Sequence, residues 1–173
     1  MKFLRLYPLF VLIAMFSGCN ETENPIQAER QPPSTYFPIE LGDKKLHLQL
    51  ALHEAERSKG LMYRDSLAPD HGMLFVFDDI AQRGFWMRNT RIPLDLAYFD
   101  ASGTLLELHK LYPYDEVSVK SRSQEIVIVI EMNRGWFERN QLSLGAKLDM
   151  SALVKAIQAR GLDPKQYPLS ILD

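Results

Sequence analysis

The sequence predicts an all-β fold, a compact β-sandwich or barrel-like domain with short helical turns and a C-terminal helix. Apolar and polar residues alternate from Leu46 to Leu52, which is the period of a half-buried strand. The segment 126–130 (IVIVI) is wholly apolar and β-branched, as buried strands are. Turn residues separate about seven such segments without long helices between them, which disfavours a doubly wound α/β sheet.

The strands follow from local patterns along the chain. Residues 72–77 (GMLFVF) are apolar on both faces, which predicts a strand covered on both sides. Pro93 separates two further strands, and the turn 100–103 (DASG) joins the second of them to the next strand in a hairpin. The predicted strands are, in chain order, 46–52, 72–77, 84–90, 94–99, 104–111, 126–130 and 147–150.

Three segments are predicted to be helical. The polar segment 54–59 is compatible with a helix that ends at Gly60 in a left-handed conformation. Residues 135–141 have the length of a single helical turn. The segment 151–160 is amphipathic, with Ser151 as its expected N-terminal cap and Gly161 at its end. The long polar segment 112–124 is predicted to be a loop.

The N-terminus has the pattern of an export signal. Lys2 and Arg5 precede the apolar stretch 6–16, which is too short for a membrane span of about 20 residues. Small residues then lead to Cys19, as in the bacterial lipoprotein signal, in which this cysteine is lipidated. An ordinary secretory signal, or a membrane anchor with an incidental cysteine, are the alternatives. Asn20 after the cysteine favours the outer membrane over the inner one, by resemblance to the enterobacterial sorting rule.

This signal gives a domain plan. Residues 1–18 are the signal peptide, 19–36 a flexible tether rich in proline and polar residues, 37–150 the mainly-β domain and 151–173 a C-terminal helical extension. The expected location is the cell envelope, with the domain anchored through Cys19 and facing the periplasm.

Composition and charge exclude several classes of protein. With 20 basic and 22 acidic residues the chain has a formal charge of −2, too little positive charge for a nucleic-acid partner. The single cysteine excludes an internal disulfide and a cysteine-based zinc cluster. No nucleophile elbow and no glycine-rich phosphate loop occurs, and no cofactor is expected.

Three clusters resemble one known family. They are the residues 60–62 (GLM), 72–75 (GMLF) and 85–90 (FWMRNT) followed by 92–95 (IPLD), and in this order they resemble domain of unknown function 192. The resemblance covers about Leu46 to Met150 and includes Ile130-Glu131 and Gly145. It implies a compact, mostly β domain that is often exported, and it implies no catalytic residue.

The candidate ligand site is a polar set next to an aromatic residue. Polar groups within apolar strands need hydrogen-bond partners, and a ligand can supply them. Trp86 offers an aromatic wall. The polar residues that would bind a small polar, sugar-like or peptide-like ligand beside it are Arg64, Asn89, Thr90 and Asp95. In the structural alternative, Asn89 and Thr90 end a strand and Asp95 braces the turn around Pro93.

The sequence therefore favours an envelope lipoprotein that binds a small polar ligand, a wall fragment or another envelope protein without catalysis. One alternative is a hydrolytic enzyme with a site near Asn89 and Asp95. The other is a Cu(I) protein, because thioethers and imidazole suit that ion. Its ligands would be Met62, His71, Met73 and Met87, although methionines beside aromatic residues are also typical of a core.

Overall fold

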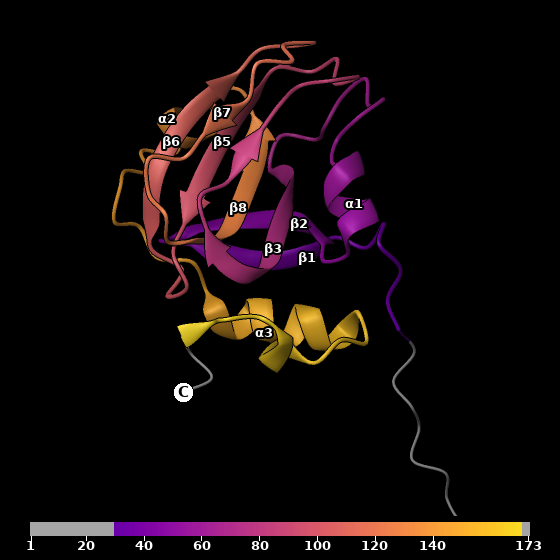
Figure 1. The fold of residues 1–173 in the computed structure, drawn as a ribbon, viewed down its shortest axis with the longest axis vertical. Helices are drawn as coiled ribbons and strands as arrows, with labels where there is room; N and C mark the ends of the chain where they lie inside the picture. Colours follow the sequence, from indigo (N-terminus) through magenta and orange to yellow (C-terminus); the bar gives the residue numbers. More distant parts are fainter. Residues whose placement is uncertain (1–29, 171–173) are drawn as a thin grey trace, which may run out of the picture.

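The computed structural model describes residues 30–170 and shows one open six-stranded sheet with a small second sheet (Figure 1). The strand order of the large sheet is β1-β2-β3-β8-β5-β6. The mainly-β prediction is confirmed, and the sheet does not close into a barrel. The signal peptide 1–18, the lipidation site Cys19 and residues 20–29 of the tether lie outside the described residues.

The large sheet is mixed. Its strands are β1 (Phe37–Leu41), β2 (Lys44–Ala51), β3 (His71–Ala81), β5 (Leu94–Phe99), β6 (Leu105–Leu111) and β8 (Ile126–Asn133). Only β2 and β3 are parallel, and the chain between them contains the short helix α1 (Glu54–Lys59). The small sheet pairs β4 (Gly84–Phe85) with β7 (Val119–Lys120).

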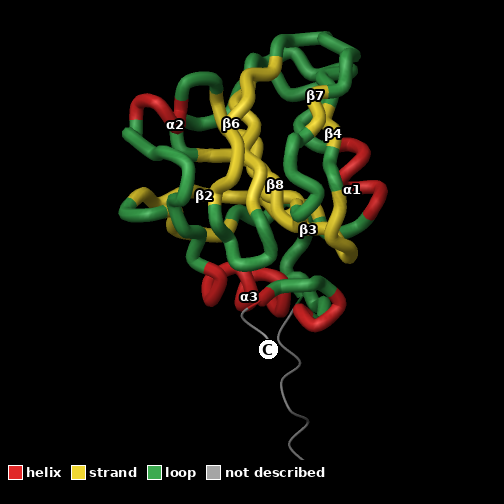
Figure 2. The backbone as a smooth tube through the Cα atoms, turned by 60° about the vertical axis from the view of Figure 1, so that its left-hand side comes forward, coloured by secondary structure: helices red, strands yellow, loops and turns green. Residues whose placement is uncertain are grey.

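The helices lie at the periphery of the strands (Figure 2). Besides α1 they are α2 (Trp136–Arg139), α3 (Met150–Ala159) and the 3-10 turn η1 (Pro164–Gln166). The predicted cap of α3 is corrected, because Asp149 rather than Ser151 accepts the hydrogen bond from the Ala152 amide. Within residues 30–170, no helix is long and apolar enough to span a membrane.

Apolar side chains cover both faces of the sheet. On one face they pack against α2, α3 and η1, and α3 lies below β1 in Figure 1. Leu153 and Ile157 of α3 are fully buried there, so the C-terminal segment completes this core. On the other face a second apolar cluster packs beneath the loops and the small sheet.

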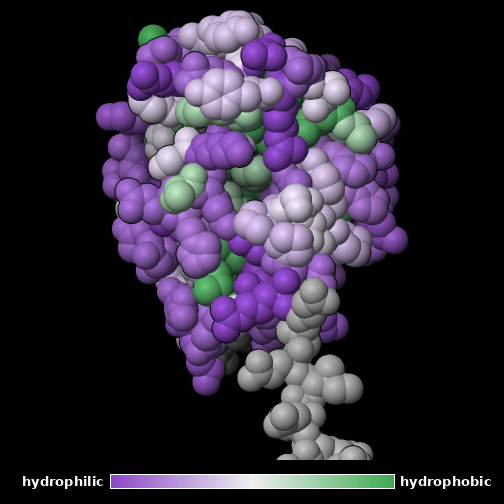
Figure 3. Space-filling model, turned by 90° about the vertical axis from the view of Figure 1, so that its right-hand side faces the viewer, coloured by the Kyte–Doolittle hydropathy of each residue, from purple (hydrophilic) through white to green (hydrophobic). Residues whose placement is uncertain are grey.

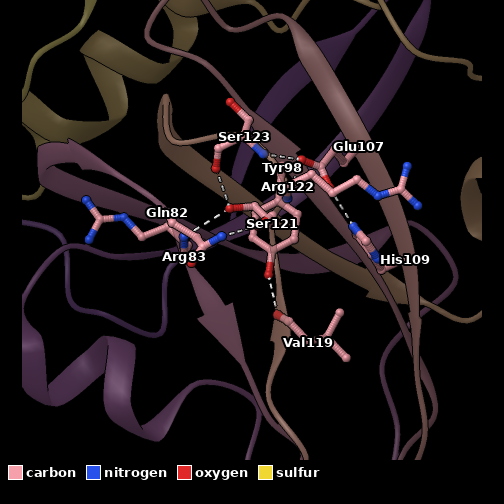
Figure 4. Close-up of polar contacts among 9 residues, drawn as sticks. All are labelled: Gln82, Arg83, Tyr98, Glu107, His109, Val119, Ser121, Arg122 and Ser123. Carbon is pink, nitrogen blue, oxygen red and sulfur yellow. Dashed lines mark hydrogen bonds and ion pairs between the residues drawn. The ribbon is translucent and has the colours of Figure 1, made fainter.

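The small sheet is tied to the second face by hydrogen bonds. The Tyr98 hydroxyl of β5 donates to the Val119 carbonyl of β7, which joins the two sheets. The Arg83 amide donates to the Ser121 hydroxyl, which joins the segments that flank β4 and β7 (Figure 4). These bonds hold the segment that the sequence assigned to a loop.

Three sequence expectations differ from the structure. The sequence pattern predicts no strand at 37–41, whereas the structure forms β1 there with Ile39 and Leu41 fully buried. The predicted strand 84–90 stops at Phe85, because residues 86–90 turn away and Asn89 has a positive φ of 55°. The predicted strand 147–150 is reduced to isolated bridges from Lys147 and Leu148, because α3 begins at Met150.

Candidate functional site

Buried polar side chains form a row across the second face of the sheet. Gln49 on β2 lies opposite Met73 on β3, and Met73 lies opposite Glu131 on β8. Directly opposed residues share one face of a sheet, so these three side chains point the same way. Gln49 and Glu131 are each only 5% exposed, which is unusual for such residues in the middle of a sheet.

Glu131 is the most perturbed acid of the described domain. Burial raises the pKa of its carboxyl to about 8, and the positive charge of Arg64 partly opposes that rise. The carboxyl is therefore mainly protonated near neutral pH. In that state it carries an O–H that can donate a hydrogen bond, and its other oxygen can accept one.

Arg64 connects the row to the N-terminal segment of the described chain. Its guanidinium donates to the Tyr36 hydroxyl at 3.0 Å and to the side-chain oxygen of Gln49. The Gln49 amide in turn donates to the Ser34 carbonyl at 2.8 Å. Residues 34–36, which the sequence assigned to the tether, are thus bound to the domain.

A small hollow of about 40 Å³ opens above Glu131. Its walls come from the end of α1, from the turn that follows and from the segment after β4. These segments are distant in the sequence, and the fold brings them together around Glu131. The lining includes Lys59, Gly60, Leu61, Met62, Phe75, Phe85, Trp86, Thr90 and Glu131. The face of the molecule around α1 is mostly hydrophilic, with apolar side chains visible in narrow gaps (Figure 3).

The hollow has an apolar wall and a basic rim. Trp86 is 47% exposed, so part of its ring is free to contact a ligand. The Arg88 guanidinium lies 5.7 Å from the Trp86 ring centroid, which adds positive charge beside that wall. Lys59 is exposed and lines the hollow as well.

Four of the five predicted ligand residues lie at or next to this hollow. Trp86 and Thr90 line it, and Arg64 acts on Glu131 through its charge. The Asn89 amide donates to the Tyr63 hydroxyl at 2.9 Å. Because both Asn89 and Tyr63 have positive φ angles, this bond joins two strained turns beside the hollow.

The fifth residue, Asp95, is not brought to this hollow. It pairs with Met132 and Lys110 on the opposite face of the sheet, where its carboxylate is 3.6 Å from the Arg134 Nε. Successive residues of a strand point to opposite faces, so Asp95 points away from the face that Leu96 occupies. Asn89 and Asp95 therefore do not form one site.

The methionine and histidine set is spread over the same face as Glu131. Met62 lines the hollow, whereas Met73 and Met87 are buried in the apolar cluster. His71 stacks on His47 at 5.1 Å, and its buried Nδ1 has no hydrogen-bond partner. Among residues 30–170, no three His, Cys, Asp or Glu side chains are grouped to hold a metal. The copper hypothesis stays a prediction.

Sequence reasoning missed Glu131 and Gln49 as site residues. A signal for Glu131 exists, since it is a lone carboxylate within the strongly apolar strand 126–133. For Gln49 the signal misled, because period-two alternation over 46–52 placed it on an exposed face. The structure buries both faces of β2.

Comparison with known proteins places the chain in a family. The model of DUF192, described as an uncharacterized ACR, matches residues 38–150. No curated protein matches.

Two solved structures are similar to this chain. The first is a Sinorhizobium meliloti 1021 protein described provisionally as a transcription regulator, with 33% identity and a TM-score of 0.65 over 69% of this chain and 96% of that one. The second is a protein of unknown function from Novosphingobium aromaticivorans, with 28% identity and a TM-score of 0.63 over 73% of this chain and 98% of that one. On the match to residues 38–150, the chain belongs to the DUF192 family.

Proposed function

We propose that this protein is an envelope lipoprotein whose domain binds a small sugar-like ligand against Trp86, at the mouth of the hollow above Glu131. The observation that carries the proposal is a buried, mainly protonated carboxyl at a hollow that a half-exposed Trp86 walls. Sugar rings present C–H groups that pack on an aromatic face and hydroxyl groups that pair with buried polar atoms. Glu131 and Thr90 supply such atoms here.

The charge of the rim narrows the ligand class. Lys59 lines the hollow and Arg88 lies beside the Trp86 ring, and both are exposed cations. An acidic group on the ligand would find a favourable electrostatic potential there. A wall fragment that carries a carboxylate would supply such a group. Anchoring through Cys19 would hold the domain at the membrane that faces such fragments.

Binding fits the hollow better than hydrolysis does. Among the described residues that line it, Glu131 is the only carboxylic acid, and none is a histidine or cysteine. Glycoside hydrolysis ordinarily uses two carboxyl groups, and nucleophilic hydrolysis needs a base beside the nucleophile. One neutral acid next to an aromatic wall can hold a ligand without this machinery.

Tryptophan fluorescence of the full chain in detergent tests the proposal. The probes are N-acetylglucosamine and N-acetylmuramic acid, which differ in a carboxylate. Trp86 is half-exposed and Trp136 is buried, so a ligand should change only the Trp86 signal. We expect saturable quenching that is stronger with the acidic sugar. Trp86→Phe should abolish the signal change, and Lys59→Gln should remove the preference for the acidic sugar.

Native mass spectrometry of the chain from its own cells provides a second readout. A co-purifying sugar-sized mass that Trp86→Ala removes would support the proposal. The absence of any bound mass, together with no quenching by either probe, would refute it.

A further inference from the structure

One edge of the large sheet is covered and the other is open. At the β1 edge the Gly42 amide donates to the Lys147 carbonyl at 2.9 Å, and the Asp149 amide donates to Glu40 at 2.8 Å. β6 ends the sheet on the other side, toward the left in Figure 1. Its first residue, Leu105, bonds to Gly145 and Ala146.

Residues 106–110 of β6 have no such cover. Within the described chain, no hydrogen bond from outside the sheet reaches their backbone. We call residues 106–110 the open edge. In an edge strand, alternate backbone N–H and C=O groups point away from the sheet and can pair with another strand.

Space for another strand exists beside the open edge. One hollow of about 360 Å³ lies between Arg122 and Leu144, and a second of about 420 Å³ lies against Phe137 and Asp95. Both are lined by Leu108 and His109, so they flank the same stretch of β6.

The side chains of the open edge are complementary to themselves. If a second copy runs antiparallel about a two-fold axis at Leu108, Glu107 lies opposite the second copy's His109, and the reverse pair follows by symmetry. Glu107 and His109 already form a hydrogen bond of 2.8 Å within one chain (Figure 4). The amides of Arg122 and Ser123 donate to the other Glu107 oxygen, which fixes this carboxylate in place.

An exposed leucine near the open edge adds an apolar element. Leu144 is 60% exposed and lies beside the start of the open edge, where it lines a hollow together with Leu106. In such a pair the second copy's Leu144 would lie toward the far end of the open edge, where Leu108 and Phe137 line the second hollow.

We propose that two copies of this chain pair through residues 106–110 and form one continuous sheet. The N-terminal segment of the chain is a poorer occupant of the open edge. Residues 20–29 include three glutamates and no lysine or arginine, so their negative charge would lie against Glu107. Pro25 also lacks the N–H that a sheet requires.

Cysteine cross-linking of the full chain in membranes tests this proposal. Opposed residues of antiparallel strands have Cα atoms about 4.5–5.5 Å apart, which suits a disulfide. With Leu108→Cys and a mild oxidant, we expect a non-reducing gel to show a band at twice the chain's mass. Two controls should give several-fold less of it: Lys155→Cys, at an exposed site on α3, and the unaltered chain, which reports on Cys19.

A second variant tests the two-fold arrangement. Leu144→Asp changes an exposed side chain, so the domain should keep its fold while the Leu108→Cys cross-link weakens. Cross-linking of Leu108→Cys no stronger than that of Lys155→Cys would overturn the proposal. So would a cross-linked product with a different mass, because this would mean that a foreign chain occupies the open edge.

Discussion

Replacing Glu131 by glutamine should remove most of the pH dependence of this protein's stability between pH 4.5 and 8. The folded state raises the pKa of Glu131 from 4.5 to about 8 because the carboxyl is buried. In this interval the folded chain holds a proton that the unfolded chain has released. The stability that the neutral carboxyl provides is therefore complete below pH 4.5 and is lost as the pH rises through about 8.

The size of the effect follows from the shift. One pKa unit corresponds to about 1.4 kcal/mol, so a rise from 4.5 to about 8 amounts to about 5 kcal/mol. That is a large part of the 5–15 kcal/mol that typically stabilises a domain. Glutamine has nearly the same shape and no charge, so the variant should match the wild type near pH 5 and exceed its stability near pH 8.

Urea unfolding of the full chain in detergent measures the effect at pH 5, 6.5 and 8. Glu116→Gln is the matched control, because Glu116 is exposed in the loop before β7 and its removal should leave the pH profile unchanged. If the wild type and Glu131→Gln show parallel profiles over this range, Glu131 is ionised in the folded protein. The binding argument based on its proton would then fail.

Four further changes have defined outcomes. Leu153→Ala should cost about 2–5 kcal/mol in urea unfolding, because this fully buried side chain of α3 leaves a cavity. Gly72→Ala should destabilise strongly in the same assay, because its Cβ would collide with the Glu131 carbonyl and the Met132 sulfur. Asp95→Asn should stay folded and keep sugar binding, because the carboxylate lies outside the hollow and its Oδ1 lies 3.6 Å from the Arg134 Nε, which is longer than a hydrogen bond. Cys19→Ala should abolish labelling by a radioactive fatty acid, and persistent label would contradict lipidation.

Much of the fold could be predicted from local patterns. The strands predicted at 72–77, 94–99, 104–111 and 126–130 lie within or close to β3, β5, β6 and β8. They were predictable because strands buried on both faces are continuously apolar, and because a turn glycine marks where a strand ends. Gly60 and Gly103 do have the positive φ angles expected where a helix and a turn end. β1 and β7 left weaker traces, since both are short and gain their pairing from strands elsewhere.

The candidate site was predictable only in part. Trp86 and Thr90 stand out as an aromatic and a polar residue in an apolar stretch, and both line the hollow. Asp95 has the same sequence signal, but the face of the sheet that its side chain occupies depends on strand register. A shift of one residue in the register moves the side chain to the other face. Glu131 enters the site only because β8 lies between β3 and β5.

The sequence by itself determined the mainly-β class, the family and the pattern of an export signal, because each depends on residues close together in the chain. The tertiary structure decided which polar groups meet. Sheet order and register bring Gln49, Met73 and Glu131 into one row, and burial then gives Glu131 its high pKa. The hollow arises from contacts between distant segments, and the open edge arises because β6 is the last strand of the sheet. Desolvation depends on the whole fold, and it makes Glu131 chemically different from the other acids of the described domain.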